Sequence, residues 1–369
     1  MASRPLGLFF AQWIIRANYF FQKKSSVQPV SDLLSPSNLS SFAYLDAEST
    51  LEKLIRVFFQ IPKDQYGSQV MIVQVQEDLK KLSADFGYKF LFEVGEILKP
   101  CEILICYKKV PNKLPKDTLC LFCYCDQQHM YWNDLSKFDA VIVHSSKALA
   151  DLSNFKNKKI YFIEEPEKKS LLEAGACSVL PSQKPGNILI YHGLYLTIPG
   201  LFKLRPVLEK IADDYSGLEL RILTNTQARI EHWGKCRVSF LTYTEENFIE
   251  QSKLACLGIV PAQSRKLKAN FFKPSSRMRK LFSVGVPAIG DRRSYMVNEF
   301  VNNLKFPADL LTADSLASWE QTIRYWLSHK GHKAELDELS QKGYACVATE
   351  YSPEKTARQW LNLLLTLVE

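Results

Sequence analysis

The chain has 369 residues, of which 46% are hydrophobic and 23% charged, and its net charge is +8. This composition is typical of a globular protein and excludes a fibrous or disordered chain, while the length predicts about two domains. The positive charge favours anionic partners such as nucleotides or phospholipid headgroups without selecting one of them. Nine cysteines without the regular spacing of a disulfide framework favour a reducing compartment, so we expect a cytoplasmic protein.

Residues 1–40 form a basic and apolar extension in which the first acidic residue is Asp32. Its apolar run, residues 6–15, is shorter than a membrane-spanning helix requires. Three interpretations stay open. The extension is a helix packed on the protein body, an interfacial helix that gives the protein a peripheral contact with a membrane, or a targeting segment that is cleaved.

Residues 41–174 alternate short apolar runs with amphipathic stretches, which predicts a first Rossmann-like domain whose parallel sheet is covered on both faces. The predicted strands are residues 41–46, 68–75, 101–109, 117–126, 139–146 and 159–165, and the predicted helices are residues 47–61 and 76–86.

Residues 175–187 are rich in Gly, Pro and Ser without periodicity, and we interpret them as a linker. A second alternating series over residues 188–350 predicts a second Rossmann-like domain. Its predicted strands are residues 187–193, 218–225, 237–243, 256–262 and 287–291, and its predicted helices are residues 201–215, 246–255 and 275–285. After Asp314 the pattern is helical, and the last helix is predicted to start with Ser352 as N-cap and Pro353 at its first position. A cleft between two such domains is the expected ligand site.

The segment "FFKPSSRMRKLFSVGVPAIGD", residues 271–291, places four cations directly before a predicted strand. A helix is predicted to start near Ser275 or Ser276, and free backbone N–H groups at a helix start bind phosphates. Lys273, Arg277 and Arg265 would add fixed positive charge there. We therefore expect a pyrophosphate at this helix start, with a solvated basic loop as the alternative.

The same segment resembles the Lys/Pro–Ser–x–Arg…Gly–x–Pro–x–Ile stretch of glycosyltransferases with the GT-B fold, in the large "group 1" (family 4-like) class. Residues 131–152, 185–225 and 351–365 resemble further parts of that fold, so the resemblance covers roughly residues 100–369. It implies two Rossmann-like domains facing a cleft, with residues 351–369 as a helical tail that crosses back to the first domain.

The resemblance also implies a hexosyltransferase-like activity, as in polysaccharide biosynthesis. A nucleotide diphosphate sugar would give its sugar to a hydroxyl of a glycan, a lipid-linked sugar or a small metabolite. The family needs no metal or other cofactor, and retention of anomeric configuration is implied. We expect no nucleic-acid partner, because the cations gather in one loop and not in a stripe with interleaved aromatic residues.

This sequence departs from the family at one motif. Many members carry two glutamates separated by seven residues, and the corresponding positions here hold Phe272 and Lys280. Some branches use a Lys-x-x-x-Arg pattern instead, which Lys273 and Arg277 fit. A non-catalytic GT-B-like binding subunit and a nucleotide-sugar epimerase therefore stay open as alternatives.

Further donor contacts are expected at strand ends of the second domain. Gly193 allows close approach of a backbone N–H to a phosphate, and His192 is either a ligand contact or a structural residue. Thr242 and Tyr243 are candidates for the nucleobase by resemblance, although turn residues explain them as well. We assign to Arg277 the catalytic role of stabilising the leaving diphosphate, with Lys273 and Ser276 beside it.

In the first domain, Asp126 and His129 follow a predicted strand and are candidates for an acceptor contact or general base. Cys120, Cys123 and Cys125 together with His129 could hold zinc. The cysteines lie in an apolar run, where strand neighbours point to opposite faces. We therefore prefer to interpret them as core residues and expect no metal site.

Overall fold

A computed structural model describes residues 54–61, 66–84, 89–107, 110–124, 135–152, 158–261, 276–328 and 332–368, with the backbone alone for residues 66–71 and Leu196. The described residues all lie within residues 51–369. The predictions for residues 1–40 and for a strand at 41–46 therefore lie outside the described residues.

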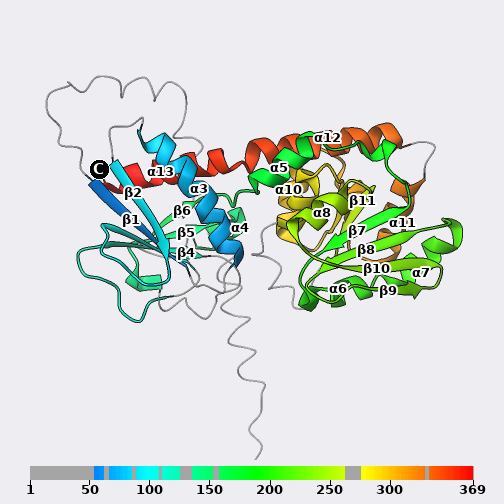
Figure 1. Cartoon of the computed structure of the whole chain (residues 1–369), viewed down its shortest axis with the longest axis horizontal. Coiled ribbons are helices and arrows are strands. Elements are labelled where there is room, and N and C mark those ends of the chain that lie inside the picture. The colour runs from blue at the N-terminus through cyan, green and yellow to red at the C-terminus, as the bar shows by residue number, and fades with distance from the viewer. Residues whose placement is uncertain are drawn as a thin grey trace, which may run out of the picture. The chain divides into compact units, whose positions relative to one another are not determined.

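The first sheet has six parallel strands in the order β2-β1-β3-β4-β5-β6 (Figure 1). The strands are β1 Leu54–Gln60, β2 Lys89–Gly95, β3 Ile103–Tyr107, β4 Leu119–Tyr124, β5 Ala140–Val143 and β6 Lys159–Phe162. The helices α3 Tyr66–Ala84 and α4 Ser146–Leu152 accompany it. Buried side chains lie on both faces of this sheet, as expected for parallel strands.

Two sequence predictions at the start of this sheet are wrong. Residues 54–60, predicted as helix, form β1, and residues 68–75, predicted as strand, lie inside α3. The run "LIRVFFQ" is short and rich in β-branched and aromatic residues, and it pairs with β2 on one side and β3 on the other. Short apolar runs fit both periods, so tertiary pairing decides between strand and helix.

The cysteines of β4 are core residues, as the sequence predicts. Cys120 and Cys123 are buried and pack into different hydrophobic clusters, so their side chains point to opposite faces of the sheet. Burial raises the pKa of the Cys120 thiol to about 11. Cys125 and His129, the other members of the hypothetical zinc set, lie outside the described residues.

The second sheet has seven strands in the order β13-β12-β11-β7-β8-β10-β9, parallel except for β9. The strands are β7 Ile188–His192, β8 Glu219–Thr224, β9 Arg229–Trp233, β10 Cys236–Thr242, β11 Leu257–Val260, β12 Ala288–Asp291 and β13 Thr312–Ala313. Without β9 the order is that of a Rossmann sheet. The strand order reverses at β7: β8 and β10 follow on one side of it, and β11, β12 and β13 on the other.

Helices cover this sheet and connect its strands (Figure 1). They are α5 Lys169–Ala176, α6 Pro199–Phe202, α7 Arg205–Asp214, α8 Glu245–Ser252, α9 Ser276–Ser283, α10 Tyr295–Leu304, α11 Leu316–Leu327 and α12 Lys333–Glu350, with short 3-10 helices η4 Pro181–Gln183, η5 Tyr195–Thr197 and η7 Ala308–Leu310. Sequence reasoning did not find β9, β13, α5 and α10, nor β2 of the first sheet.

The last helix, α13 Pro353–Val368, packs against α3 and the core of the first sheet, where Trp360 meets Phe59 edge-to-face. Its predicted N-cap is confirmed, because the Ser352 hydroxyl accepts a hydrogen bond from the Lys355 N–H at 3.2 Å. The two sheets with their helices and this tail confirm the predicted α/β architecture. In the part of the chain that the structure describes, no helix is long and apolar enough to span a membrane.

Candidate functional site

The candidate site lies at the carboxyl end of β7, where the strand order of the second sheet reverses. Such a reversal opens a crevice between the loops that follow the two neighbouring strands. His192 ends β7 and Gly193 follows it, while α9 begins at Ser276, after the loop that leaves β11. The sequence therefore brings the strand end "YHG" and the helix start "SRMRK" to one place.

Arg277, in the first turn of α9, is held by a chain of hydroxyl groups from β7 and η5. Its Nη1 donates to the Tyr191 hydroxyl at 3.1 Å, which lies 2.6 Å from the Thr197 Oγ1. The Thr197 hydroxyl donates to the Leu194 carbonyl at 2.6 Å. Because each hydroxyl carries one proton, Tyr191 must donate to Thr197 and accept from Arg277.

Among the residues that the structure describes, Arg277 is a partly buried cation without an anionic partner. No described carboxylate forms an ion pair with it, and within the described part of the chain its side chain donates to the Tyr191 hydroxyl. Burial lowers the pKa of the guanidinium, while Tyr191 acts in the opposite direction. A buried charge usually has a compensating partner, so this position is suited to an anionic ligand.

Position 193 requires glycine, because the Thr197 and Tyr191 hydroxyls leave no room for a side chain. A Cβ atom at this position would lie 2.6 Å from the Thr197 Oγ1 and 2.9 Å from the Tyr191 hydroxyl. Both distances are shorter than real Cβ contacts. The glycine therefore lets the Tyr191–Thr197 hydrogen bond form beside the backbone that leaves β7.

His192 is a structural residue that joins β7 to α9. It is buried, and its Nε2 donates to the Arg277 carbonyl at 3.1 Å. Its ring packs against Phe248, with ring centroids 4.9 Å apart. Burial, followed by the charge of Lys280, lowers the pKa of His192 well below its usual value, so the imidazole is neutral.

Lys280 lies one turn after Arg277 in α9 and faces the same region. Its Nζ donates to the Tyr243 hydroxyl at 3.4 Å, and the Tyr243 ring stands beside His192. Burial works against the charge of Lys280, but Glu167 and Tyr243 outweigh it, so the pKa is raised. The position where many members of the resembled family carry a glutamate thus holds a cation next to carboxylates.

Arg279 faces away from Arg277 and Lys280, and its contacts account for one of the cations in the basic run. It is 3% exposed, donates to the Glu165 carbonyl at 2.9 Å and to the Glu165 Oε2 at 3.2 Å, and lies over the Tyr351 ring. The basic run therefore has two functions. Arg279 holds α9 against the segment after β6, and Arg277 with Lys280 faces the end of β7.

A second contact holds the segment after β6 against α8. Lys168 forms an ion pair with Glu245, the first residue of α8, and the Ser170 hydroxyl donates to the same carboxylate. These contacts lower the pKa of Glu245 although burial opposes them. They fix the start of α8, which carries Phe248 against His192.

The predicted site residues have different outcomes. Arg277, Gly193, His192 and Tyr243 come together, whereas the Thr242 hydroxyl donates to the Thr226 carbonyl at 3.5 Å in a neighbouring loop. Ser276 is the first residue of α9. Asp126, His129, Arg265 and Lys273 lie outside the described residues, so their roles stay predictions.

Sequence reasoning missed Tyr191, Thr197 and Glu167. Tyr191 carries a hydroxyl in the otherwise apolar strand "ILIYH", which is the one local signal that could have found it. Thr197 and Glu167 come from separate segments, and nothing in their local sequence indicates their partners.

No protein-family model matches the sequence, and no curated protein matches it. Solved structures match the fold. An alpha-glucosyltransferase in complex with UDP and a 13-mer DNA has a TM-score of 0.59 at 9% identity, with 85% of this chain and 100% of that chain covered. TarM of S. aureus has a TM-score of 0.53 at 14% identity, with 71% of this chain covered.

The match to TarM covers 54% of that protein, so this chain spans about half of its length. The sucrose-phosphate synthase of Thermosynechococcus elongatus has a TM-score of 0.52 at 15% identity, with 84% of this chain and 80% of that chain covered. These proteins are glycosyltransferases of the GT-B fold. The likeness shows that this chain has the GT-B fold, as the sequence predicts.

Proposed function

We propose that this chain, with its GT-B fold, is a glycosyltransferase that uses a nucleotide diphosphate sugar. The second sheet binds the donor at the end of β7. The acceptor is a hydroxyl of a glycan, a lipid-linked sugar or a small metabolite. In the transfer, the bond from the anomeric carbon to the diphosphate breaks, the acceptor oxygen bonds to that carbon with retention of configuration, and the acceptor proton passes to a base.

The observation that carries this proposal is the position of Arg277. It is a partly buried guanidinium without a carboxylate partner among the described residues, at a helix start on the switch point of a Rossmann-like sheet. A guanidinium and the free N–H groups of a helix start both favour a phosphate. The same groups would stabilise the charge that develops on the leaving diphosphate.

The roles of four further residues are proposed from the sequence. Lys273 and Arg265 would add charge around the diphosphate, and Asp126 or His129 would contact the acceptor or take its proton. Because Arg277 and the helix start would carry the leaving-group charge, we propose that transfer needs no metal ion. Turnover in the presence of EDTA should then equal turnover with added Mg²⁺.

The first experiment is thermal unfolding of the purified chain with UDP, GDP, ADP and CMP and their sugar conjugates. A ligand that binds the native state raises its stability by about 2.7 kcal/mol at a hundredfold excess over its dissociation constant. Arg277→Gln should remove the shift. The matched control is Arg205→Gln, which alters an exposed cation on α7 and should keep it. A nucleotide shift that Arg277→Gln leaves intact would contradict the assignment.

A second candidate function is a non-catalytic nucleotide-sugar-binding subunit. The observation in its favour is Lys280, which lies beside Glu167 and Tyr243 where many related enzymes carry a carboxylate. Release of free nucleotide from the bound donor separates the two functions. Binding without any turnover, over a broad screen of acceptors, would favour the subunit.

A further inference from the structure

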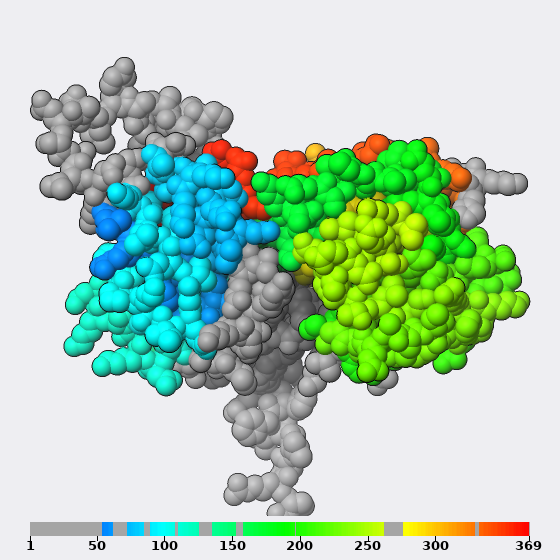
Figure 2. Space-filling model, in the orientation of Figure 1, coloured from blue at the N-terminus to red at the C-terminus, as the bar shows by residue number. Residues whose placement is uncertain are grey.

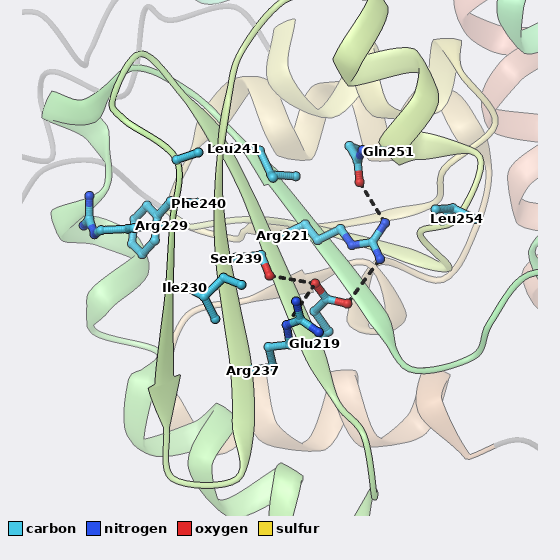
Figure 3. Close-up of a pocket in the computed structure, with 11 residues that line it drawn as sticks. Glu219, Arg221, Arg229, Ile230, Arg237, Ser239, Phe240, Leu241, Gln251 and Leu254 are labelled. Atoms are coloured by element: carbon cyan, nitrogen blue, oxygen red, sulfur yellow. Dashed lines mark hydrogen bonds and ion pairs between the residues drawn. The ribbon is translucent and has the colours of Figure 1, made fainter.

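In a Rossmann-like sheet, a helix usually connects the two strands that correspond to β8 and β10. Here the connection contains the strand β9 instead, and β9 forms the edge of the sheet. The connection from β8 to β10 covers residues 225–235 and contains β9. No helix from this connection covers the sheet beside α8. An open pocket of about 700 Å³ remains there, lined by Ser239 and Ile230 together with the Glu219–Arg221–Gln251 network (Figure 3).

The edge of β9 lies at the surface. Among the described strands, β10 alone pairs with β9, which ends the strand order of the sheet (Figure 1). The side chain of Ile230 is unusual there, because the residue is apolar, β-branched and 58% exposed. Residues of β8 to β10 and α8, green to yellow-green in Figure 2, form part of the visible surface.

The turn after β9 decides which backbone groups face outward. Trp233 and Cys236 are paired across the two-residue turn Gly234–Lys235, in which Gly234 has a φ of 58° and Lys235 a negative φ. This is a type II′ hairpin, whose closing pair is hydrogen-bonded. Hydrogen-bonded pairs alternate along an antiparallel ladder, so the N–H and C=O groups of Ile230 point away from β10.

The sequence of β9 is complementary to itself about Ile230. If two copies of "RIE" run antiparallel with Ile230 opposite Ile230, each Arg229 stands opposite the Glu231 of the other copy. In one copy these two side chains already form an ion pair at 2.7 Å on the same face of the strand. Cross-strand aliphatic pairs and opposite charges both stabilise a sheet. The outward N–H and C=O groups of the two Ile230 residues would exchange hydrogen bonds.

We propose that β9 pairs with β9 of a second copy of this chain, about a two-fold axis at Ile230. The two second sheets then form one continuous sheet across an isologous interface. This pairing removes an exposed edge, which is otherwise a site for unspecific association. The interface shares no residue with the group around Arg277, so the proposal is independent of the donor site.

The test is sedimentation velocity of the full chain over a wide concentration range. The wild type should form a dimer. Glu231→Arg places Arg opposite Arg at two positions and should weaken association roughly tenfold or more. Arg229→Glu places Glu opposite Glu and should do the same. The double change Arg229→Glu with Glu231→Arg restores opposite charges and should restore the dimer.

Mixing the two single variants gives the sharpest outcome. Each alone should be largely monomeric, but the mixture should form a mixed dimer, because Arg then faces Glu at both positions. Ile230→Lys should also disrupt the dimer, with Ile230→Val as the matched control that keeps it. Thermal unfolding of each variant checks the fold. A monomeric wild type, or a dimer that the single charge changes leave intact, would overturn the proposal.

Discussion

The Arg277 Nη1 lies 3.1 Å from the Tyr191 hydroxyl, and that hydroxyl is oriented by Thr197. The Thr197 proton goes to the Leu194 carbonyl, so the Tyr191 oxygen has its lone pairs free for the guanidinium. The next-to-last residue of β7 therefore sets the position of a cation in the first turn of α9. Preorganised donors of this kind lower the cost of binding an anion.

Tyr191→Phe should weaken nucleotide binding about tenfold. The substitution keeps the ring but removes the acceptor that orients Arg277, and a hydrogen bond to a charged group contributes about 1.5–3 kcal/mol. Isothermal titration with the nucleotide that binds the wild type measures the loss. Tyr195→Phe is the control, because Tyr195 is 49% exposed and its hydrogen bond to Asn225 is made by the backbone N–H, which the substitution keeps. Equal affinities for the wild type and Tyr191→Phe would mean that Tyr191 does not position Arg277.

Gly193→Ala should destabilise the fold by about 1–3 kcal/mol, as overpacking of a closely filled site does. The added methyl group would meet the Thr197 Oγ1 at 2.6 Å. Urea unfolding of the single variant and of Gly193→Ala with Thr197→Ala separates the causes. The double variant should lose less stability than the sum of its two single changes. Strict additivity would show that the methyl group meets no resistance from Thr197.

The sequence predicts the place of the site better than its partners. Strand, glycine and helix patterns put His192, Gly193 and Arg277 at the end of β7, because the carboxyl ends of parallel strands share one edge of a sheet. Which groups contact Arg277 and Lys280 depends on the tertiary structure. Tyr191 is adjacent in sequence to His192 yet faces Thr197, and Glu167 comes from the segment after β6, where no local signal indicates its neighbour Lys280.

The secondary structure, like the site, is predictable from the sequence in some parts and not in others. The second sheet is predicted in nearly all its parallel strands, because its short apolar segments alternate with longer amphipathic helical segments, and this alternation is typical of a parallel sheet. The start of the first sheet is not, since residues 54–60 and 68–75 are both apolar with unclear periodicity. The edge strand β9 was missed because "RIEHW" contains mostly charged or polar residues, and its pairing with β10 depends on the turn at Gly234.

Lys280→Glu should destabilise the fold by on the order of 3 kcal/mol, since it replaces a cation beside the buried Glu167 by an anion. Burial raises the pKa of Glu167, and loss of Lys280 should raise it further. A carboxyl with a raised folded pKa gives up stability as the pH rises through its range. The deficit relative to the wild type should therefore grow with pH.

Denaturant unfolding of the Lys280→Glu chain at several pH values between acid and neutral measures this deficit. Lys280→Gln removes the cation without adding an anion and should lie between the other two chains. A deficit that does not change with pH would mean that Lys280 has no electrostatic contact with Glu167.

Lys184 is a buried cation between two helix ends. It is 7% exposed, and its Nζ donates to the Ser252 carbonyl at 3.0 Å and to the Gly285 carbonyl at 3.4 Å. Ser252 ends α8, and Gly285 follows the end of α9. Helix ends of this kind carry partial negative charge, which favours a cation. Burial nevertheless lowers the pKa of Lys184 from its usual 10.5 to about 8.

Because the folded pKa of Lys184 is lowered, the unfolded chain binds more protons between about pH 8 and 10.5, and this residue makes the fold more stable as the pH rises through that range. The full effect is about 3 kcal/mol. Lys184→Met cannot titrate, so the stability of the wild type relative to this variant should increase from pH 8 to pH 10.5. Denaturant unfolding of both chains across this range measures the difference, in which other groups cancel. A difference that stays constant, or that falls with pH, would mean that Lys184 keeps an ordinary pKa in the folded protein.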